Sequence, residues 1–312
     1  MVTNLINHTY FKTVNMKKTN FMLSLLAIGL SLSTLEVSAQ KKWEGFSDQE
    51  QFNNNFELKT EELLKNSKFI TSEQAAKDLV AAEGKKIDVL LAKPRKKTLE
   101  ASEIASLIKP SFVAFASAYD CGKCHRTHLN TASGYIISED GLIVTNHHVI
   151  EGFIASKNGK NLAMSIQTND GDVFLVSEIV SSFKDADLAI VKVDTKGKKL
   201  TPLPLGNTAN VGDNVFVMSN PAPMINYFST GKVARNYLSP ISKTDKLPQT
   251  DITADYAAGS SGAPIVDQCG NLISTVSSTR SIYYDMKEQK NLQMVVKNTK
   301  PVVLLKELIK NI

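Results

Sequence analysis

The stretch ASGYIISEDGLIVTNHHV, residues 132–149, decides the fold. Its two short apolar runs, Tyr135–Ser138 and Leu142–Thr145, are separated by the turn residues Glu139-Asp140-Gly141. Apolar runs of this length bounded by turn residues are typical of β-strands. The second run leads directly into two histidines, so the sequence places titratable side chains at the end of an apolar strand.

The same pattern of short apolar runs separated by turn residues continues from Pro110 toward the C-terminus. Turn residues recur at Asn169–Asp172 and Gln268–Asn271. Many short strands with turns between them predict an all-β sandwich or a pair of barrels. A last helix is expected over about Lys300 to Lys310. The other predicted strands are Phe112–Ala116, Val173–Val180, Leu188–Val193, Val215–Met218, Pro264–Val266, Leu272–Val276 and Leu292–Val296.

Composition places the chain among ordinary folded proteins. Of its 312 residues, 42% are hydrophobic and 21% are charged, and only 3 are cysteines. These values exclude a disordered chain, a collagen and a small disulfide scaffold. The formal charge is +5, but the first 39 residues hold three lysines and one glutamate, which leaves +3 for the rest. So small an excess, with no basic run interleaved with aromatic residues, argues against nucleic acid as a partner.

The first 39 residues are predicted to be a leader. Met16-Lys17-Lys18 is followed by the apolar run Phe21–Leu32 and then by Val37-Ser38-Ala39. This order of basic, apolar and small residues is that of a secretory signal peptide, with Met16 as the better start. The apolar run is too short for a free-standing membrane span. We therefore expect export to the periplasm or the medium, with no membrane association after the leader is removed.

Residues 40–99 are predicted to form a polar helical extension. Ser47-x-x-Glu50 and Thr71-x-x-Gln74 have the pattern of helix capping boxes. The region lacks a strong apolar core and a cluster of catalytic residue types, so we expect a helical arm packed on the main domain. A further helix is predicted over Thr98–Lys109, before Pro110.

Three segments carry residue types suited to nucleophilic catalysis. His148 follows a strand, Asp187 opens an apolar run, and Ser261 lies in a turn flanked by Gly259 and Gly262. A serine nucleophile needs a base, and the base needs an acid that holds its tautomer. Flanking glycines allow backbone N–H groups to converge on a developing oxyanion. The N–H groups of Gly259 and Ser261 are the candidates for that role.

In order and surroundings, these segments resemble the chymotrypsin-fold serine peptidases, and within them the HtrA/Deg-like bacterial branch. The similar stretches are ASGYII at 132–137, DGLIVTNHHV at 140–149, DLA at 187–189 and GSSGAP at 259–264. The resemblance covers about 200 residues, from Pro110 to the C-terminal helix. Ser260 stands where the family commonly has Asn or Asp, and Ala263 stands where it has a second Gly.

The resemblance implies two antiparallel six-stranded β-barrels with an active site between them. It places a trypsin-like peptidase domain over residues 100–312, with one barrel at about 110–200 and the other at about 205–297. No PDZ domain is expected behind the C-terminal helix.

The resemblance also implies the role of each residue. His148 accepts the proton of Ser261, Asp187 orients His148, and the N–H groups of Gly259 and Ser261 hold the oxyanion. His147 is expected beside the site or at the surface. The implied function is a serine endopeptidase that hydrolyses protein or peptide substrates through an acyl-enzyme without a cofactor. A catalytically silent peptide-binding protein of the same fold is the alternative, and the oligomeric state is left open.

Two acids compete as the determinant of primary specificity. In trypsin-like relatives, the residue six positions before the nucleophile lies at the base of the specificity pocket, and here that residue is Asp255. An acid at this place favours Lys or Arg in the substrate. The HtrA-like alignment offers Asp251 instead, with two extra residues before the nucleophile.

The stretch DCGKCHRTH at 120–128 gathers cysteine and histidine between the first two strands. Export favours a disulfide, either Cys121–Cys124 or one of these with Cys269. The stretch also holds the donors of a zinc-type site. Cys121-x-x-Cys124-His125 is moreover the string used for covalent haem attachment, so a metal-binding or haem-binding protein is a further alternative. Unpaired thiols are the remaining possibility.

Overall fold

The computed structural model describes residues 45–157 and 159–310. Asp48–Ile312 forms one compact unit, which contains every helix and strand named below. The predicted leader, residues 1–39, lies outside the described residues. No helix in the described part of the chain is long and apolar enough to cross a membrane.

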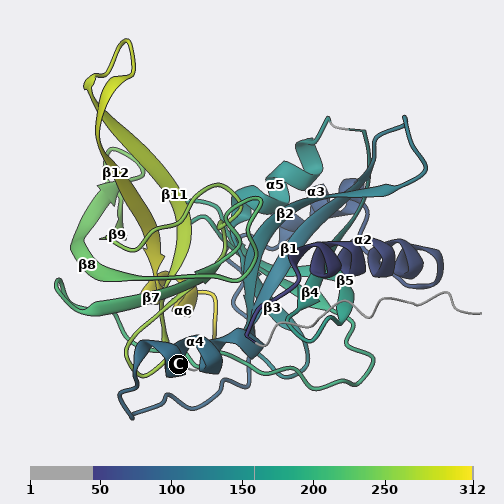
Figure 1. Ribbon diagram of the computed structural model, residues 1–312, viewed down its shortest axis with the longest axis horizontal. Coiled ribbons are helices and arrows are strands. Elements are labelled where there is room, and N and C mark those ends of the chain that lie inside the picture. The colour runs from purple at the N-terminus through teal and green to yellow at the C-terminus, as the bar shows by residue number, and fades with distance from the viewer. Residues whose placement is uncertain (1–44, 158, 311–312) are drawn as a thin grey trace, which may run out of the picture. The chain divides into compact units, whose positions relative to one another are not determined.

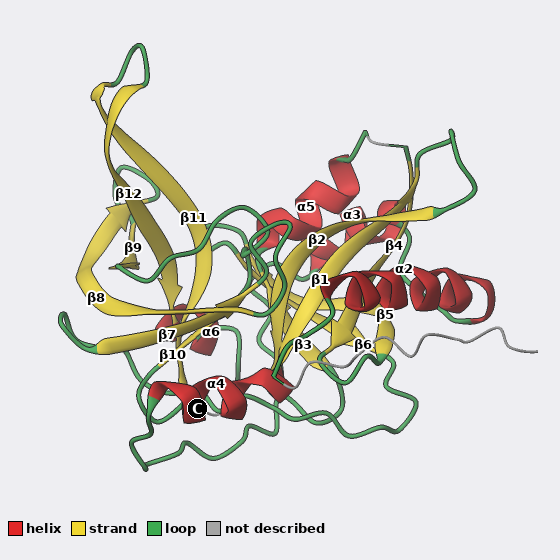
Figure 2. Ribbon diagram, in the orientation of Figure 1, coloured by secondary structure: helices red, strands yellow, loops and turns green. Residues whose placement is uncertain are grey.

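The strands of this unit form two closed antiparallel barrels (Figures 1 and 2). The first has the strand order β1-β2-β3-β6-β5-β4 and the second has the order β10-β11-β12-β9-β8-β7. The first barrel consists of β1 Phe112–Asp120, β2 Thr127–Ile136, β3 Leu142–Thr145, β4 Lys160–Thr168, β5 Val173–Phe183 and β6 Leu188–Val193. The second consists of β7 Asn214–Ser219, β8 Tyr227–Pro240, β9 Lys246–Ile252, β10 Pro264–Val266, β11 Leu272–Asp285 and β12 Lys290–Pro301. The all-β double barrel that the sequence predicts is thereby confirmed.

The hairpin of β2 and β3 is buried on both faces. Tyr135 pairs with Val144 across the two strands, and Ile136 pairs with Ile143. Because successive side chains of a strand point to opposite faces, the two pairs enter different cores. Ile136 and Ile143 lie in the core of the first barrel, whereas Tyr135 and Val144 lie in a core shared with residues of the second barrel. Burial on both faces explains why this stretch is continuously apolar.

The connection between the barrels is fixed by backbone hydrogen bonds to the second barrel. The N–H of Gly206 donates to the carbonyl of Leu272 at 2.7 Å, and the N–H of Leu272 donates to the carbonyl of Pro204 at 2.8 Å. The side chains of Leu203 and Leu205 enter the shared core. The connection therefore helps to hold the two barrels against each other.

The helices pack around the barrels. They are α2 Gln49–Asn66, α3 Ser72–Ala81, α4 Ala101–Ile108, α5 His147–Ala155 and α6 Val302–Lys306, with a short 3-10 turn at Lys109–Ser111. Phe56 of α2 packs with Ala114 and Ala116 of β1, and Leu79 of α3 belongs to the core of the first barrel. The polar extension thus uses the barrel to bury its apolar residues.

Three strands, β4, β8 and β9, and one helix, α5, were not predicted from the sequence. β8 mixes polar, charged and apolar residues without alternation and is exposed or half-buried at every position except Val233, so it has no continuous apolar face to signal a strand. β4 and β9 each begin with three exposed or half-buried residues, the first of them a lysine, and β9 contains Pro248, which normally argues against a strand interior. The helix α5 is short and contains Gly152, so its apolar residues read as a continuation of the strand before it.

The helix caps of the extension agree with the sequence at one place and differ at the other. Thr71 caps α3, and its side chain accepts a hydrogen bond from the N–H of Gln74 at 3.2 Å. Ser47 was expected to cap α2, but Asp48 does so by accepting the N–H of Gln51 at 2.9 Å. Ser and Asp are both favourable N-cap residues, so the sequence does not decide between these neighbours.

Docking of α2 on the first barrel yields a stability prediction. Phe56 is 1% exposed, whereas Leu58 on the same helix is 68% exposed. Phe56→Ala should lower the free energy of unfolding by about 3–5 kcal/mol, because it removes a buried ring and leaves a cavity. Leu58→Ala, the matched control, should change it by less than about 0.5 kcal/mol. Equal effects of the two substitutions in urea unfolding would show that α2 is not docked as described.

Candidate active site

The junction of β3 and α5 positions the predicted base. β3 ends at Thr145, α5 begins at His147, and Asn146 between them has the extended backbone of an N-cap residue. The Asn146 side chain does not cap its own helix. Its Nδ2 instead donates to the carbonyl oxygen of Asp187 at 2.8 Å. The side chain of the N-cap residue Asn146 thus connects the turn that carries Asp187 to the turn that carries His148.

The two adjacent histidines have different surroundings. His147 is 5% exposed, and its Nδ1 lies 3.6 Å from a carboxylate oxygen of Glu151, one helical turn further on. The side chain of His148 is 46% exposed and lies between Asp187 and Ser261. A surface position for His147 was therefore wrong, because the first turn of α5 directs this ring into the protein.

Asp187 lies in the turn before β6 and is largely buried, with a side chain 18% exposed. Its carboxylate accepts the backbone N–H of His148 at 3.0 Å and lies 2.9 Å from Nδ1 of the same residue. Ser277 Oγ of β11 donates to it at 2.6 Å. Burial raises the pKa of the Asp187 carboxyl, but the hydrogen bonds and electrostatic attraction from His148, together with the hydrogen bond from Ser277, outweigh burial and hold the pKa below its usual value.

This environment fixes the tautomer of His148. An ionised carboxylate accepts hydrogen bonds and donates none, so Nδ1 of His148 carries the hydrogen that points at Asp187. Nε2 is then free to accept, and it lies 3.0 Å from Ser261 Oγ. The serine hydroxyl therefore donates to a nitrogen that is able to take its proton.

The turn before β10 presents Ser261 and depends on two glycines. Gly259 has φ +93° and Gly262 has φ +85°, a left-handed conformation that favours glycine. A Cβ at Gly259 would lie 2.5 Å from the carbonyl oxygen of Asn220, and one at Gly262 would lie 2.3 Å from that of Ser133. Any side chain at either position would displace the turn.

The backbone of this turn is anchored to the first barrel through Ser133. The N–H of Ser133 donates to the carbonyl of Ser261 at 2.9 Å, and its Oγ donates to the carbonyl of Gly259 at 3.0 Å. Among the described residues, the N–H groups of Gly259 and Ser261 are donors in no hydrogen bond. Both amides expected to hold an oxyanion therefore keep their hydrogen-bonding capacity.

Sequence reasoning missed two residues that position the site, Ser133 and Ser277. Ser133 lies before the predicted strand Tyr135–Ser138, and Ser277 lies just beyond the predicted strand Leu272–Val276. Each acts through a contact with the opposite barrel, at 126 and 90 positions of separation in the chain. No local pattern in the sequence signals such contacts.

The two candidate specificity acids lie in different environments. Asp255 is 78% exposed, and its carboxylate is 3.5 Å from Nζ of Lys297. Asp251 is 3% exposed and pairs with Arg235 and with Nδ2 of Asn298. Both acids line a cavity of about 450 Å³ formed by β8, β9, β11 and β12 and the segment after β9, and Ser261 is not among its lining residues.

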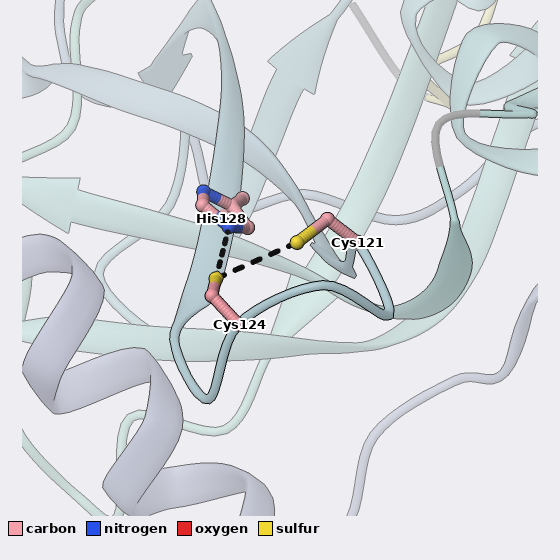
Figure 3. Close-up of side chains that lie close together, drawn as sticks. All are labelled: Cys121, Cys124 and His128. Carbon is pink, nitrogen blue, oxygen red and sulfur yellow. Dashed lines mark hydrogen bonds between the residues drawn. The ribbon is translucent and has the colours of Figure 1, made fainter.

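The three cysteines are free thiols. Cys121 and Cys124 lie in the turn between β1 and β2, with their sulfur atoms 3.5 Å apart (Figure 3). Cys269 lies in the turn between β10 and β11 of the other barrel. The structure therefore does not contain the disulfide that export led us to expect. A hydrogen bond from the Lys123 backbone and the neighbouring Cys124 thiol lower the pKa of Cys121 to about 7.

Comparison with known proteins shows what part of this chain is similar to. Residues 132–274 match the model of the trypsin-like peptidase domain. Protease Do-like 5, chloroplastic, of Arabidopsis thaliana is 34% identical over 157 residues, which cover 48% of this chain and 48% of that protein. Serine protease HTRA3 of Homo sapiens is 33% identical over 153 residues, covering 46% of this chain and 32% of that protein. Serine endoprotease DegS of Haemophilus influenzae is 31% identical over 153 residues, which cover 47% of this chain and 42% of that protein.

This chain spans about half or less of the length of these curated relatives. Among solved structures, the crystal structure of Deg5 covers 67% of this chain and 93% of that chain, at 23% identity and a TM-score of 0.49. The double barrel agrees with the match of residues 132–274 to the trypsin-like peptidase domain. Within that class, the chain is similar to the HtrA/Deg proteases, as its sequence motifs predict.

The hydrogen bonds to Asp187 yield a prediction about its pKa. Ser277→Ala should raise the pKa of the Asp187 carboxyl, because one of the hydrogen bonds that lower it is removed. Titration of the Asp187 carboxyl carbon by NMR measures this pKa directly. Ser278→Ala, at the next and exposed position of β11, is the matched control and should leave the pKa unchanged. The same midpoint in wild type and Ser277→Ala would contradict the described geometry.

Proposed function

We propose that this protein is an exported serine endopeptidase that cleaves protein substrates through Ser261, His148 and Asp187. The observation that supports this most strongly is the continuous chain of hydrogen-bonding groups from Asp187 through His148 to Ser261, with separations of 2.9 and 3.0 Å. The names of the similar proteins, serine protease and serine endoprotease, agree with it. The catalytic geometry is that of a general template for serine peptidases.

In the acylation step, Ser261 Oγ attacks the carbonyl carbon of a peptide bond while Nε2 of His148 takes its proton. The imidazolium that forms is stabilised by the buried carboxylate of Asp187, which stays ionised because its pKa is held low. Nε2 then gives the proton to the leaving amine, and the acyl group remains on Ser261 as an ester. Water activated by the same nitrogen releases the acyl group in the second half of the reaction.

The negative charge on the carbonyl oxygen needs donors that are already in place. The N–H groups of Gly259 and Ser261 are assigned this role, because they adjoin the nucleophile and are donors in no hydrogen bond of the described residues. Two such amides stabilise a tetrahedral intermediate more than the planar substrate. The proposed reaction uses Ser261, His148, Asp187 and these two amides, and no step of it uses a metal or another cofactor.

The regions outside the barrels are assigned roles from their sequence and contacts. Residues 1–39 are proposed to be the leader that directs export to the periplasm or the medium, and Met16 its start. Residues 40–99 are proposed to be a helical extension of the peptidase domain at 100–312, because Phe56 and Leu79 bury their side chains against the first barrel. The expected partners are protein or peptide substrates.

Covalent labelling tests the nucleophile. A fluorophosphonate probe should label the wild-type protein and should not label Ser261→Ala, because the probe reacts only with an activated serine. His148→Ala should slow labelling by about a thousandfold or more, since the serine loses its base. Ser106→Ala serves as the matched control, because Ser106 lies on α4 and, among the described residues, its hydroxyl hydrogen-bonds only with the Ser102 carbonyl.

Labelling of Ser106→Ala should equal that of the wild type, with folding of all variants checked by circular dichroism. A well-folded wild type that takes no label would contradict the proposal and favour the silent peptide-binding protein. Retained label on Ser261→Ala would show that another residue reacts.

The position of Asp255 beside Lys297 predicts opposite effects of two substitutions on specificity. If Asp255 recognises a basic side chain, the ammonium group 3.5 Å away competes for its charge. The ratio of cleavage after Arg to cleavage after Ala in matched peptides should then fall in Asp255→Asn and rise in Lys297→Met. Unchanged ratios in both variants would exclude Asp255 as the specificity acid.

A further inference from the structure

The turn between β1 and β2 holds three metal-ligating side chains outside the proposed active site. Sγ of Cys124 lies 3.5 Å from Sγ of Cys121 and 3.0 Å from Nε2 of His128. All three ligand atoms lie within 4.8 Å of one another. Figure 3 shows the two sulfur atoms and the imidazole directed toward one region at the end of the hairpin.

The exposure of these thiols is unusual for cysteines that only pack. Free cysteine is among the most buried residue types, because its side chain behaves as a small apolar group. Cys124 is exposed and Cys121 is half-buried. Neither side chain belongs to a hydrophobic cluster of the described residues. Their position is therefore explained better by ligand chemistry than by the core.

The separations are close to those that a tetrahedral zinc ion requires. With Zn–S bonds of about 2.3 Å and a Zn–N bond of about 2.05 Å, two sulfur ligands lie about 3.8 Å apart, and sulfur and nitrogen about 3.6 Å apart. The sulfur–sulfur separation here, 3.5 Å, is about 0.3 Å shorter, and the sulfur–nitrogen separation, 3.0 Å, is about 0.6 Å shorter. All three ligand atoms lie within 4.8 Å of one another, so side-chain rotations that widen these separations by about 0.3 and 0.6 Å would admit the ion.

The surroundings hold the donors in this arrangement. His128 pairs with Tyr119 across β1 and β2, and the two rings stack with centroids 5.3 Å apart, which directs the imidazole toward Cys124. Asp120 accepts the N–H of Gly122 at 2.8 Å and fixes the start of the turn. Arg126, at its end, forms an ion pair with Glu57 of α2 at 2.5 Å.

We propose that Cys121, Cys124 and His128 bind one Zn²⁺ ion, with a solvent molecule as the fourth ligand. Two sulfur donors and one imidazole select a soft or borderline metal and disfavour Mg²⁺ and Ca²⁺, which take oxygen ligands. No fourth Cys, His, Asp or Glu ligand atom joins the group among the described residues. The ion closes the open end of the β1–β2 hairpin and takes no part in the proposed peptide hydrolysis.

Zinc binding by the reduced full-length protein tests this assignment without any use of peptidase activity. The protein is stripped with a chelator, loaded with excess zinc sulfate, desalted and analysed for metal. Wild type should retain one zinc per chain, and Cys124→Ser and His128→Ala should retain almost none. Cys269→Ser, which removes the thiol outside the group, is the matched control and should retain zinc as the wild type does.

Cobalt substitution gives a readout that does not depend on the variants folding. Co²⁺ bound to wild type should show a sulfur-to-metal charge-transfer band, which excess zinc removes. Absence of retained zinc in reduced wild type would overturn the proposal, as would equal retention by all four proteins. A Cys121–Cys124 disulfide without bound metal in protein purified without reductant would also overturn it.

Discussion

The site depends on one backbone contact between the two barrels. The N–H of Ser133 in the first barrel donates to the carbonyl of Ser261 in the turn that enters the second, at 2.9 Å. Neither barrel carries all of the proposed catalytic groups, because His148 and Asp187 belong to the first and Ser261 adjoins the second. A displacement of about 1 Å between such groups can lower a rate by about a hundredfold. The contact keeps the two halves in register, and Gly262 permits it because a Cβ there would lie 2.3 Å from the Ser133 carbonyl oxygen.

A second contact between the barrels serves the acid. Asp187 follows β5 of the first barrel, yet one of its hydrogen-bond donors, Ser277, comes from β11 of the second. Burial alone would favour the neutral carboxyl, and the hydrogen bonds from both barrels reverse this preference. The ionised acid in turn selects the tautomer of His148 whose Nε2 faces Ser261. The protonation states of Asp187 and His148 therefore depend on the packing of the two barrels against each other.

The turn between β1 and β2 and the helix α2 are held by contacts within the first barrel and the extension. The β1–β2 hairpin extends to a turn held by the Asx contact of Asp120, the stacked rings of Tyr119 and His128, and the ion pair of Arg126 with Glu57. That ion pair links the turn to α2, whose Phe56 is buried against β1. The polar helical extension and the cysteine-bearing turn thus stabilise the same side of the first barrel, and neither contributes a group to the proposed catalysis.

The sequence by itself determined the all-β class, the strands β3, β6, β7 and β10, the starts of β1 and β11, and the order of the histidine, aspartate and serine segments. It did so because these strands are buried and continuously apolar, and because the turn at Ser261 needs glycines at fixed positions. Only the tertiary structure decided that β8 is a strand and that Ser133 and Ser277 support the site. It also placed Cys124 beside His128 and left the thiols unpaired. Those features arise from pairings between residues far apart in the chain, and hydrogen bonds across such distances leave no periodicity in the sequence.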